Sequence, residues 1–167
     1  MIFQLDLVEF EYSDEIFDES VFDNSERNQV YHIAGYILRS VTKNYTVCEA
    51  CFSPCISDCP YSKNFTKYTV LKDYTGQSLL YVTEPIYLFF IALERIFRDN
   101  VTSVVHHNEN VSSQLAVLMK SVKTDIFTEE CHNIRDKIIE RFVTFRLRIF
   151  EPYKIRINKY DSRSMAL

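Results

Sequence analysis

NSERNQVYHIAGYILRSV, residues 24–41, decides the fold, because its apolar side chains recur every three or four residues. That spacing places them on one stripe of an α-helix. Asn24 or Ser25 is expected to cap this helix, with Glu26 in the first turn, where a negative charge suits the helix dipole. Gly35 lies beside the stripe, so another backbone segment is expected to approach the helix closely there. The stripe comprises Val30, Ile33, Ala34, Ile37, Leu38 and Val41.

Similar apolar patterns farther along the chain predict three more helices. The first of them is expected to begin at Thr83 as N-cap, and residues 100–110 are expected to form a loop after it. The last helix is expected to be capped by Thr128 and limited by Pro152. The predicted buried faces are Ile86, Phe89, Phe90, Leu93, Ile96 and Phe97; then Val111, Leu115, Leu118 and Val122; and finally Ile134, Ile138, Phe142, Phe145 and Ile149.

The composition of the 167 residues agrees with one helical domain. Hydrophobic residues make up 47% and charged residues 25%, which is the balance of a folded globular protein. Two glycines are too few for a Rossmann fold, a P-loop or a hairpin-rich sandwich, which all need turns with positive φ. We therefore predict a mainly α single domain with a cysteine-rich loop over residues 48–59. At most a short β element is expected, within the Tyr-, Thr- and Val-rich residues 61–82.

Charge is unevenly distributed along the chain, although the formal net charge is only -4. The first 26 residues contain nine Asp or Glu and no Lys or Arg, whereas a stretch near the other end is rich in Lys and Arg. We predict an acidic, loosely packed arm over residues 1–27, a helical domain over residues 28–150 and a basic tail over residues 151–167. The basic end is expected to face phosphates; the alternative is two solvated surfaces that attract each other.

The sequence also bears on the compartment of the protein. No stretch of 18 or more apolar residues is present, so no membrane span is expected. The first residues lack the pattern of a signal peptide, which favours a reducing, intracellular location with cysteines as thiols or metal ligands. Four acceptor patterns for N-glycosylation support another alternative, a secreted glycoprotein with disulfides. The four patterns begin at Asn44, Asn64, Asn100 and Asn110.

A C-x-x-C pair is the clearest candidate for a metal site. Two thiolates at this spacing can hold one tetrahedral zinc ion, which needs two further ligands. A Cys-His pair expected in the first turn of the last helix can supply them, since a helix N-terminus lowers the pKa of a thiol. The alternative is a set of buried thiols that only fill space. The predicted ligands are Cys48, Cys51, Cys131 and His132, with Cys55 and Cys59 as the other candidate pair.

The last predicted helix carries a row of cations beside its apolar stripe. Such a row can contact DNA phosphates in a way that depends on salt and not on base sequence. The alternative is an ordinary amphipathic surface. The predicted DNA-binding residues are Arg135, Lys137, Arg141, Arg146 and Arg148. We predict no catalytic residue, because the sequence contains no nucleophile elbow, no HExxH and no phosphate-cradling loop.

Three blocks of sequence, in their order and approximate spacing, point to one family. The first is NQVYHIAGYILRSV (28–41) followed by the C-x-x-C pair, and the second is GQSLLYVTEPIYLFFIALERIFR (76–98). The third is CHNIRDKIIERFVTFRLRIF (131–150). Together they resemble the YIAGYV-type helix with its C-x-x-C, the central segment leading into a helix with a Glu and a Phe, and the closing helix of P-element-like transposases, including THAP-domain transposases.

The resemblance implies the carboxy-terminal region of a transposase, downstream of its RNase H-like catalytic core. We find no counterpart of the core's three carboxylates, of its GTP-binding insertion or of the THAP zinc module. The resemblance implies a nuclear module associated with DNA transposition, which contacts DNA backbone, supports the catalytic core and is inactive alone. Whether the isolated chain is an enzyme and whether it forms a homo-oligomer stay open. The alternative function is a non-enzymatic, zinc-stabilised protein-interaction domain whose acidic arm binds a protein.

Two geometric expectations complete the prediction. The first and last predicted helices should pack together, and the cysteine-rich loop should lie near the start of the last helix. One zinc ion can hold Cys51 and Cys131 together only if the two residues lie within about 10 Å of each other.

Overall fold

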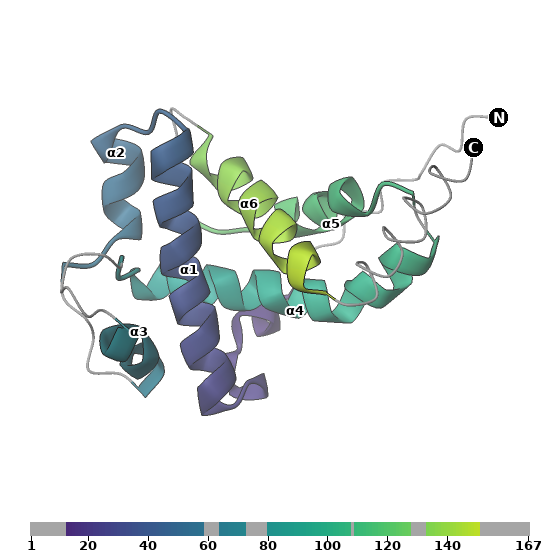
Figure 1. Cartoon of the computed structure of the whole chain (residues 1–167), viewed down its shortest axis with the longest axis horizontal. Coiled ribbons are helices and arrows are strands. Elements are labelled where there is room, and N and C mark those ends of the chain that lie inside the picture. The colour runs from purple at the N-terminus through teal and green to yellow at the C-terminus, as the bar shows by residue number, and fades with distance from the viewer. Residues whose placement is uncertain (1–12, 59–63, 73–79, 108, 128–132, 151–167) are drawn as a thin grey trace, which may run out of the picture.

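The computed structural model describes residues 13–58, 64–72, 80–107, 109–127 and 133–150. Over these residues the protein is the mainly α single domain that we predicted, with no named strand (Figure 1). No helix in the described part of the chain is long and apolar enough to cross a membrane. The elements in chain order are η1 (Asp14–Phe17), η2 (Glu19–Val21), α1 (Asn24–Asn44), α2 (Glu49–Phe52), η3 (Ser53–Cys55), η4 (Asn64–Thr66), α3 (Lys67–Lys72), α4 (Glu84–His107), α5 (Val111–Lys120) and α6 (Ile134–Ile149), where η marks a 3₁₀ turn.

Helix α1 packs against both α4 and α6. It crosses the long α4 and packs beside α6, while α5 lies against both α4 and α6 (Figure 1). The predicted packing of the first helix against the last is therefore confirmed. The core lies where the apolar stripes of these helices face one another, and its largest fully buried side chains include Tyr31, Tyr87, Phe89, Phe90 and Phe142.

Helix α1 begins slightly earlier than predicted, because its N-cap is Asp23 and not Asn24 or Ser25. The Asp23 carboxylate accepts a hydrogen bond from the backbone N–H of Glu26 at 2.8 Å. The Glu26 carboxylate in turn accepts one from the backbone N–H of Asp23 at 2.9 Å. This capping box satisfies two N–H groups that have no partner inside the helix. The predicted stripe is confirmed, since Val30, Ala34, Ile37, Leu38 and Val41 are buried and Ile33 is half-buried.

Helix α4 begins directly after Thr83, as predicted, but it continues to His107. The expected loop over residues 100–110 is therefore wrong for most of its length. The polar residues that suggested a loop face solvent on a helix whose other side stays apolar. The residues that continue the buried stripe beyond Phe97 are Val101, Val104 and Val105.

The predicted face of α6 is largely correct, with its last residue as an exception. Ile149, expected in the core, is 50% exposed. The helix ends there, in agreement with the limit that Pro152 was expected to set. The predicted cap Thr128 lies outside the described residues, and α6 begins at Ile134 after Asn133, whose φ of 52° is left-handed.

Residues 49–55 of the cysteine segment form two short helical turns, so the predicted cysteine-rich loop is not confirmed. α2 leads directly into η3, and an antiparallel bridge pairs Ile56 with Val82. Val82 lies at the end of residues 61–82, where at most a short β element was expected, and the bridge is isolated from any named strand. The Thr83 hydroxyl donates a hydrogen bond to the Pro54 carbonyl at 3.0 Å, which fastens the segment to the start of α4.

Residues 64–72, for which a strand or extended loop was expected, form η4 and α3 instead. The ring of Phe65 explains the difference. It stacks on Tyr87 with centroids 4.1 Å apart and meets Tyr31 at 5.5 Å. Burial of this ring between α1 and α4 outweighs the β-propensity of the neighbouring Thr, Tyr and Val.

Gly35 is the point where another backbone meets α1, as its position beside the stripe predicted. A Cβ placed on Gly35 would lie closer than 3.0 Å to the carbonyl oxygen of Leu80, a separation that real Cβ atoms essentially never show. The segment that contains Leu80 is held in place, because the Tyr31 hydroxyl donates to the Val82 carbonyl at 3.2 Å. The Ser57 N–H also donates to the Tyr81 carbonyl at 2.8 Å.

The acidic segment packs on the domain from residue 13 onward. Ile16 and Phe22 are only 8% and 3% exposed, and both belong to the core. Arg27 of α1 donates to the backbone carbonyl of Phe22 at 2.9 Å. Loose packing is therefore wrong for residues 13–22, while residues 1–12 lie outside the described part.

Candidate nucleic-acid interface

Helix α6 separates the five predicted DNA-binding residues into two groups. Successive residues of an α-helix differ in direction by about 100°, so residues spaced by four, seven or eleven lie on one side. Lys137, Arg141 and Arg148 follow this spacing and form a ridge along one side of α6. Arg135 and Arg146 lie on the opposite side of the helix, toward α4 and α5. The predicted row of five cations is therefore divided between two sides of the helix.

The ridge is held against the end of α1 by an aromatic ring. Tyr45, the C-cap of α1, has the Lys137 ammonium 5.0 Å and the Arg141 guanidinium carbon 5.7 Å from its ring centroid. Cation–π attraction places these cations without using their N–H donors, which stay available for a phosphate. Tyr45 lies three residues before Cys48 in the chain, so these contacts place the first turn of α6 near the residues that lead into the cysteine segment.

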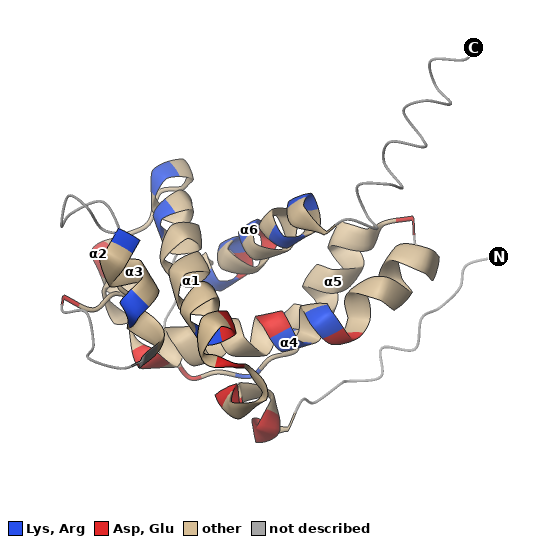
Figure 2. Ribbon diagram, turned by 60° about the horizontal axis from the view of Figure 1, so that its bottom comes forward, with Lys and Arg blue, Asp and Glu red and all other residues tan. Residues whose placement is uncertain are grey.

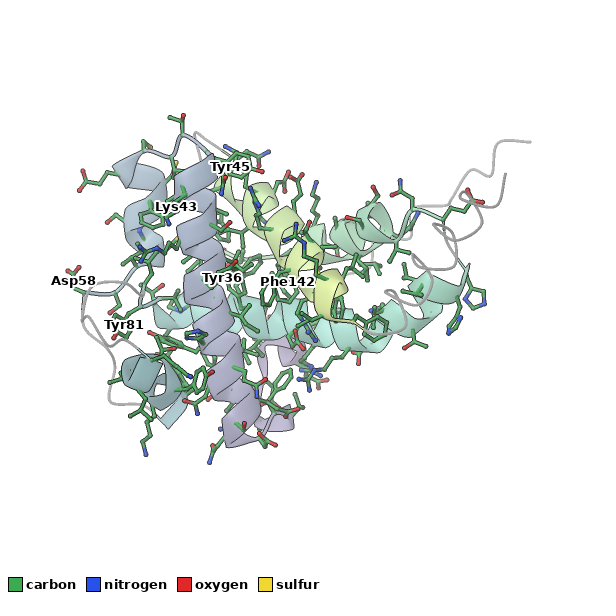
Figure 3. The ribbon with its side chains drawn as sticks, viewed as in Figure 1. Tyr36, Lys43, Tyr45, Asp58, Tyr81 and Phe142 are labelled. Carbon is green, nitrogen blue, oxygen red and sulfur yellow. The ribbon has the colours of Figure 1, made fainter. Side chains whose placement is uncertain are left out.

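A second aromatic pair lies farther along the same side of α6. The rings of Tyr36 and Phe145 are 5.5 Å apart, and Tyr36 is 55% exposed. Phe145 lies four residues after Arg141 and three before Arg148, so it separates these two cations on the helix. Figure 3 shows Tyr36 and Tyr45 at α1 beside α6, with Lys43 on the same helix. We call this strip the α1–α6 seam; it comprises Tyr36, Lys43, Tyr45, Lys137, Arg141, Phe145 and Arg148.

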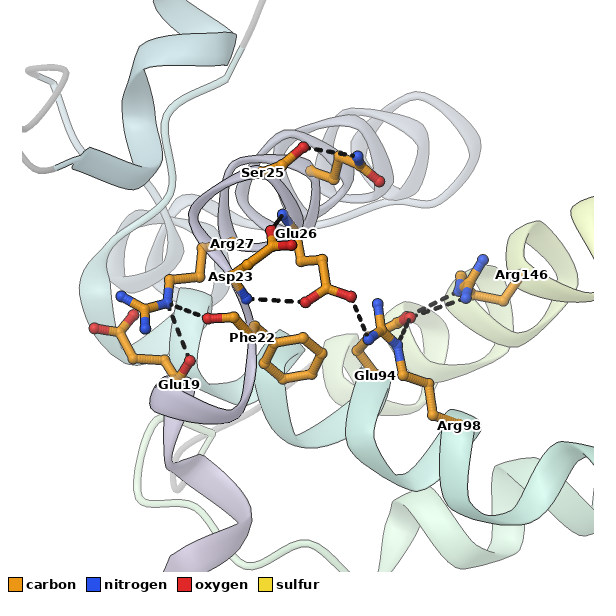
Figure 4. Close-up of polar contacts among 10 residues, drawn as sticks. Glu19, Phe22, Asp23, Ser25, Glu26, Arg27, Glu94, Arg98 and Arg146 are labelled. Atoms are coloured by element: carbon orange, nitrogen blue, oxygen red, sulfur yellow. Dashed lines mark hydrogen bonds and ion pairs between the residues drawn. The ribbon is translucent and has the colours of Figure 1, made fainter.

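Arg146 is engaged in the interior, where it pairs with the buried carboxylate of Glu94 (Figure 4). The Arg146 Nε donates a hydrogen bond to Oε2 of Glu94 at 2.8 Å, and the Arg146 Nη2 donates one to Oε1 of Glu94 at 2.9 Å. The Nε of Arg98 donates to the same Oε1 at 2.9 Å. Because Glu94 is only 4% exposed, its charge needs both guanidinium partners. Arg146 therefore joins α6 to α4 and is poorly placed for contact with DNA.

The same network reaches the start of α1. Arg98 also donates to Glu26 at 2.8 Å, and its guanidinium lies 4.7 Å from the ring centroid of Phe22 (Figure 4). The backbone N–H of Asp23, followed by Arg98, lowers the pKa of the Glu26 carboxyl below its usual value. One line of charges thus connects the start of α1, the middle of α4 and the end of α6.

Arg135 also serves the fold. Its guanidinium donates to the backbone carbonyl of Lys120 at 2.8 Å and to that of Val122. These carbonyls belong to the end of α5 and the turn after it, where such groups have no partner within the helix. Arg135 therefore fastens α5 to α6.

The two sulfurs of the C-x-x-C pair lie close together. The Sγ atoms of Cys48 and Cys51 are 3.5 Å apart, and two thiolates on one tetrahedral zinc lie roughly 3.8 Å apart. Cys51 is buried and Cys48 half-buried. Cys131, His132 and Cys59 lie outside the described residues. Within the described ranges, no three His, Cys, Asp or Glu side chains form a group that could hold a metal.

Several residues that shape this region were not predicted from the sequence. Glu94 interrupts an otherwise apolar helical face, and a charge in such a place signals a buried ion pair. Tyr36 lies in the YIAGYV-type block and Tyr45 in the first N-glycosylation pattern, but neither pattern connects these residues or Lys43 with the last helix. Only their position beside α6 brings them to the cationic ridge.

Comparison with known families gives a match over most of the chain. The family described as DNA transposase THAP9, C-terminal domain, matches residues 17–161. This match contains α1 to α6 and begins within η1, in the segment expected to be an arm. Comparison with curated proteins gives no match, and comparison with solved structures gives none. The resemblance to THAP-type transposases is thereby confirmed, and the chain belongs to the family of the DNA transposase THAP9 C-terminal domain.

Proposed function

We propose that this transposase module contacts DNA backbone through the α1–α6 seam and supports the catalytic core of the parent transposase, without cleaving DNA itself. The observation that carries the proposal is the ridge of Lys137, Arg141 and Arg148, with Lys43 exposed across the seam on α1. The Tyr45 ring already positions Lys137 and Arg141. These two side chains therefore lose less conformational entropy when they bind a phosphate.

The distribution of charge supports one orientation toward DNA. Figure 2 shows Lys and Arg along α6 and toward one end of α1, whereas Asp and Glu gather around η1 and η2 near its other end. Such separation attracts phosphates to the cationic end and repels them from the acidic end. We therefore place DNA at the seam, away from the acidic turns.

Binding of duplex DNA to the full chain, measured by fluorescence anisotropy over a range of salt, tests this proposal. We expect Arg141→Ala/Arg148→Ala to weaken binding and to reduce the slope of log affinity against log salt by about 2, since each phosphate contact contributes roughly 0.9. The matched control is Lys67→Ala/Lys72→Ala on α3, which removes two charges away from the seam and should retain binding. Equal slopes for the two double variants would exclude DNA contact through the ridge.

We also propose that zinc stabilises the module near the start of α6. The short separation of the Cys48 and Cys51 sulfurs supports this site, and the family resemblance supports a Cys-His pair as the other ligands. We expect about one zinc per chain by elemental analysis. A chelator should lower the melting temperature of the wild type but leave that of Cys48→Ser/Cys51→Ser unchanged. Metal-free protein with an unaltered melting curve in chelator would contradict this. The proposed ligands are Cys48, Cys51, Cys131 and His132; Cys55 is not among them, because in the described part of the chain it forms no three-residue metal group with Cys48 and Cys51.

A protein-interaction domain is the second candidate function. It is favoured by the exposed apolar side chains of α3, where Leu71 is 74% and Val70 44% exposed. The two candidates differ in their response to Leu71→Asp, which should leave DNA affinity unchanged. If Leu71→Asp abolishes co-purification with the parent catalytic core while Arg141→Ala/Arg148→Ala does not, α3 is the core-facing surface. We propose a nuclear location in either case, which a fluorescent fusion tests.

A further inference from the structure

Aromatic and cationic side chains alternate along the α1–α6 seam. From the start of α6, Lys137 and Arg141 flank the ring of Tyr45, the Tyr36–Phe145 pair follows, and Arg148 comes last. From Lys137 to Arg148 the ridge is about 16 Å long at the rise of an α-helix. A row of cations alone would suffice for a duplex backbone, so the interleaved rings need a separate explanation.

Tyr36 is more exposed to solvent than the other two aromatic side chains of the seam. Tyr45 is already engaged by two cations, and Phe145 is half-buried on α6. Tyr36 contacts Phe145 with the rings tilted by 48°, yet 55% of it is exposed. A tyrosine ring that rests on another ring and remains largely open offers a flat apolar surface at a fixed place.

We propose that the α1–α6 seam binds unpaired DNA, with Tyr36 as the platform on which a base stacks and the flanking cations as phosphate ligands. This inference rests on the proposed function, because it uses the same seam, and it specifies the class of DNA. Tyr36 is a binding residue in this proposal, and Tyr45 is a positioning residue that orders Lys137 and Arg141.

The chemistry of single strands favours them over duplexes at such a surface. Proteins that bind single-stranded nucleic acid combine a cationic track for the backbone with aromatic rings on which bases stack. In a duplex the base faces are covered by their neighbours, so an exposed ring gains little unless the helix is deformed. The alternation of arginines with an open tyrosine therefore matches a strand whose bases are free.

The test compares two strands that carry the same phosphates. One is an oligothymidylate of about 12 nucleotides, within the usual range of site sizes, and the other is an abasic strand of equal length. The full chain is titrated with each strand and with a duplex by fluorescence anisotropy. The variants are Tyr36→Ala, Tyr36→Phe and the control Tyr68→Ala, which removes a 40% exposed tyrosine from α3. Circular dichroism verifies that each variant keeps its helical content.

We expect the wild type and Tyr36→Phe to prefer the oligothymidylate to the abasic strand by about tenfold, the usual value of one stacked base. Tyr36→Ala should bind both strands equally, with duplex affinity unchanged, and Tyr68→Ala should behave as the wild type. A wild type that does not distinguish the two strands overturns the inference. The inference is also overturned if Tyr36→Ala weakens binding to the oligothymidylate and to the abasic strand by the same factor.

The failure of this inference can be told from failure of the proposed function. If Arg141→Ala/Arg148→Ala weakens binding to duplex and abasic strand but Tyr36→Ala changes nothing, the seam contacts only backbone and the stacking role is excluded. If the wild type binds none of the three DNAs, both the proposed function and this inference are wrong.

Discussion

Replacement of Gly35 by alanine should destabilise the protein, although the same change at an exposed helical position would stabilise it. Gly35 lies within α1, where alanine is favoured over glycine by about 1 kcal/mol. An added methyl group, however, would lie closer than 3.0 Å to the Leu80 carbonyl oxygen. The sign of the effect therefore depends on whether the Leu80 backbone can move away.

The surrounding hydrogen bonds indicate that it cannot move cheaply. The residues that follow Leu80 are fixed by Tyr31 and Ser57, which donate to the carbonyls of Val82 and Tyr81. Overpacking a well-packed site costs about 1–3 kcal/mol, and a clash with anchored backbone belongs at the upper end. After subtraction of the gain in helix propensity, we expect a net loss of about 2 kcal/mol in the free energy of unfolding.

Urea unfolding followed by far-ultraviolet circular dichroism measures this difference. Gln29 is exposed on α1, so the pair Gln29→Gly and Gln29→Ala gives the propensity term in the same helix without the clash. We expect Gln29→Ala to be more stable than Gln29→Gly by about 1 kcal/mol. Gly35→Ala should lower the melting temperature by roughly 4–8 °C, at 2–4 °C per kcal/mol for a chain of this size. A Gly35→Ala protein more stable than the wild type would refute the close approach of Leu80.

Three further predictions follow from the charged and titrating groups. Arg146→Met should lower the free energy of unfolding by about 3 kcal/mol, because it leaves the buried Glu94 carboxylate with Arg98 as its only cationic partner. The control Arg148→Met should change the free energy of unfolding by less than about 0.5 kcal/mol. Urea titration of the two variants measures the difference. Burial lowers the pKa of His32 below 6.5, so below that pH the unfolded state binds more protons than the folded state. The free energy of unfolding should therefore fall as the pH drops below 6.5. His32→Gln should flatten this part of a profile of melting temperature against pH. The hydrogen bond from the Asp23 backbone N–H, followed by the one from Arg98, lowers the pKa of the Glu26 carboxyl below 4.5. The stabilisation from Glu26 is therefore complete above pH 4.5 and is lost as the pH falls through the lowered pKa. Glu26→Gln should remove this acid-induced loss from the profile of melting temperature against pH.

The sequence predicted those features that depend on neighbours three or four residues apart. The stripe of α1, the start of α4 and the end of α6 follow from the spacing of apolar residues and from proline and capping residues. The close approach at Gly35 was also predictable, because a glycine beside a buried stripe leaves room for backbone. The same reasoning ended α4 too early, since it weighed the polar residues after residue 99 above the three valines that continue the buried face.

The candidate interface was predictable only in part. A helical wheel of α6 already separates Lys137, Arg141 and Arg148 from Arg135 and Arg146, but it does not say which partners other helices bring to either group. That depends on which helices cover α6, and the contacts with α4 and α5 occupy the second group. Tyr36 could not be connected with the ridge at all, since it lies more than 100 residues before Phe145.

Periodicity along the chain thus determined the helical class, the buried stripes and the family, because each is recorded in short-range spacing and in local motifs. The tertiary structure alone decided which charged side chains form ion pairs and hydrogen bonds within the protein and which stay exposed. Glu94 and Arg146 are 52 residues apart, and the cost of burying a charge depends on the partner that another helix brings to it. The same crossing of α1 and α6 turns two ordinary amphipathic helices into one strip of aromatic and cationic side chains.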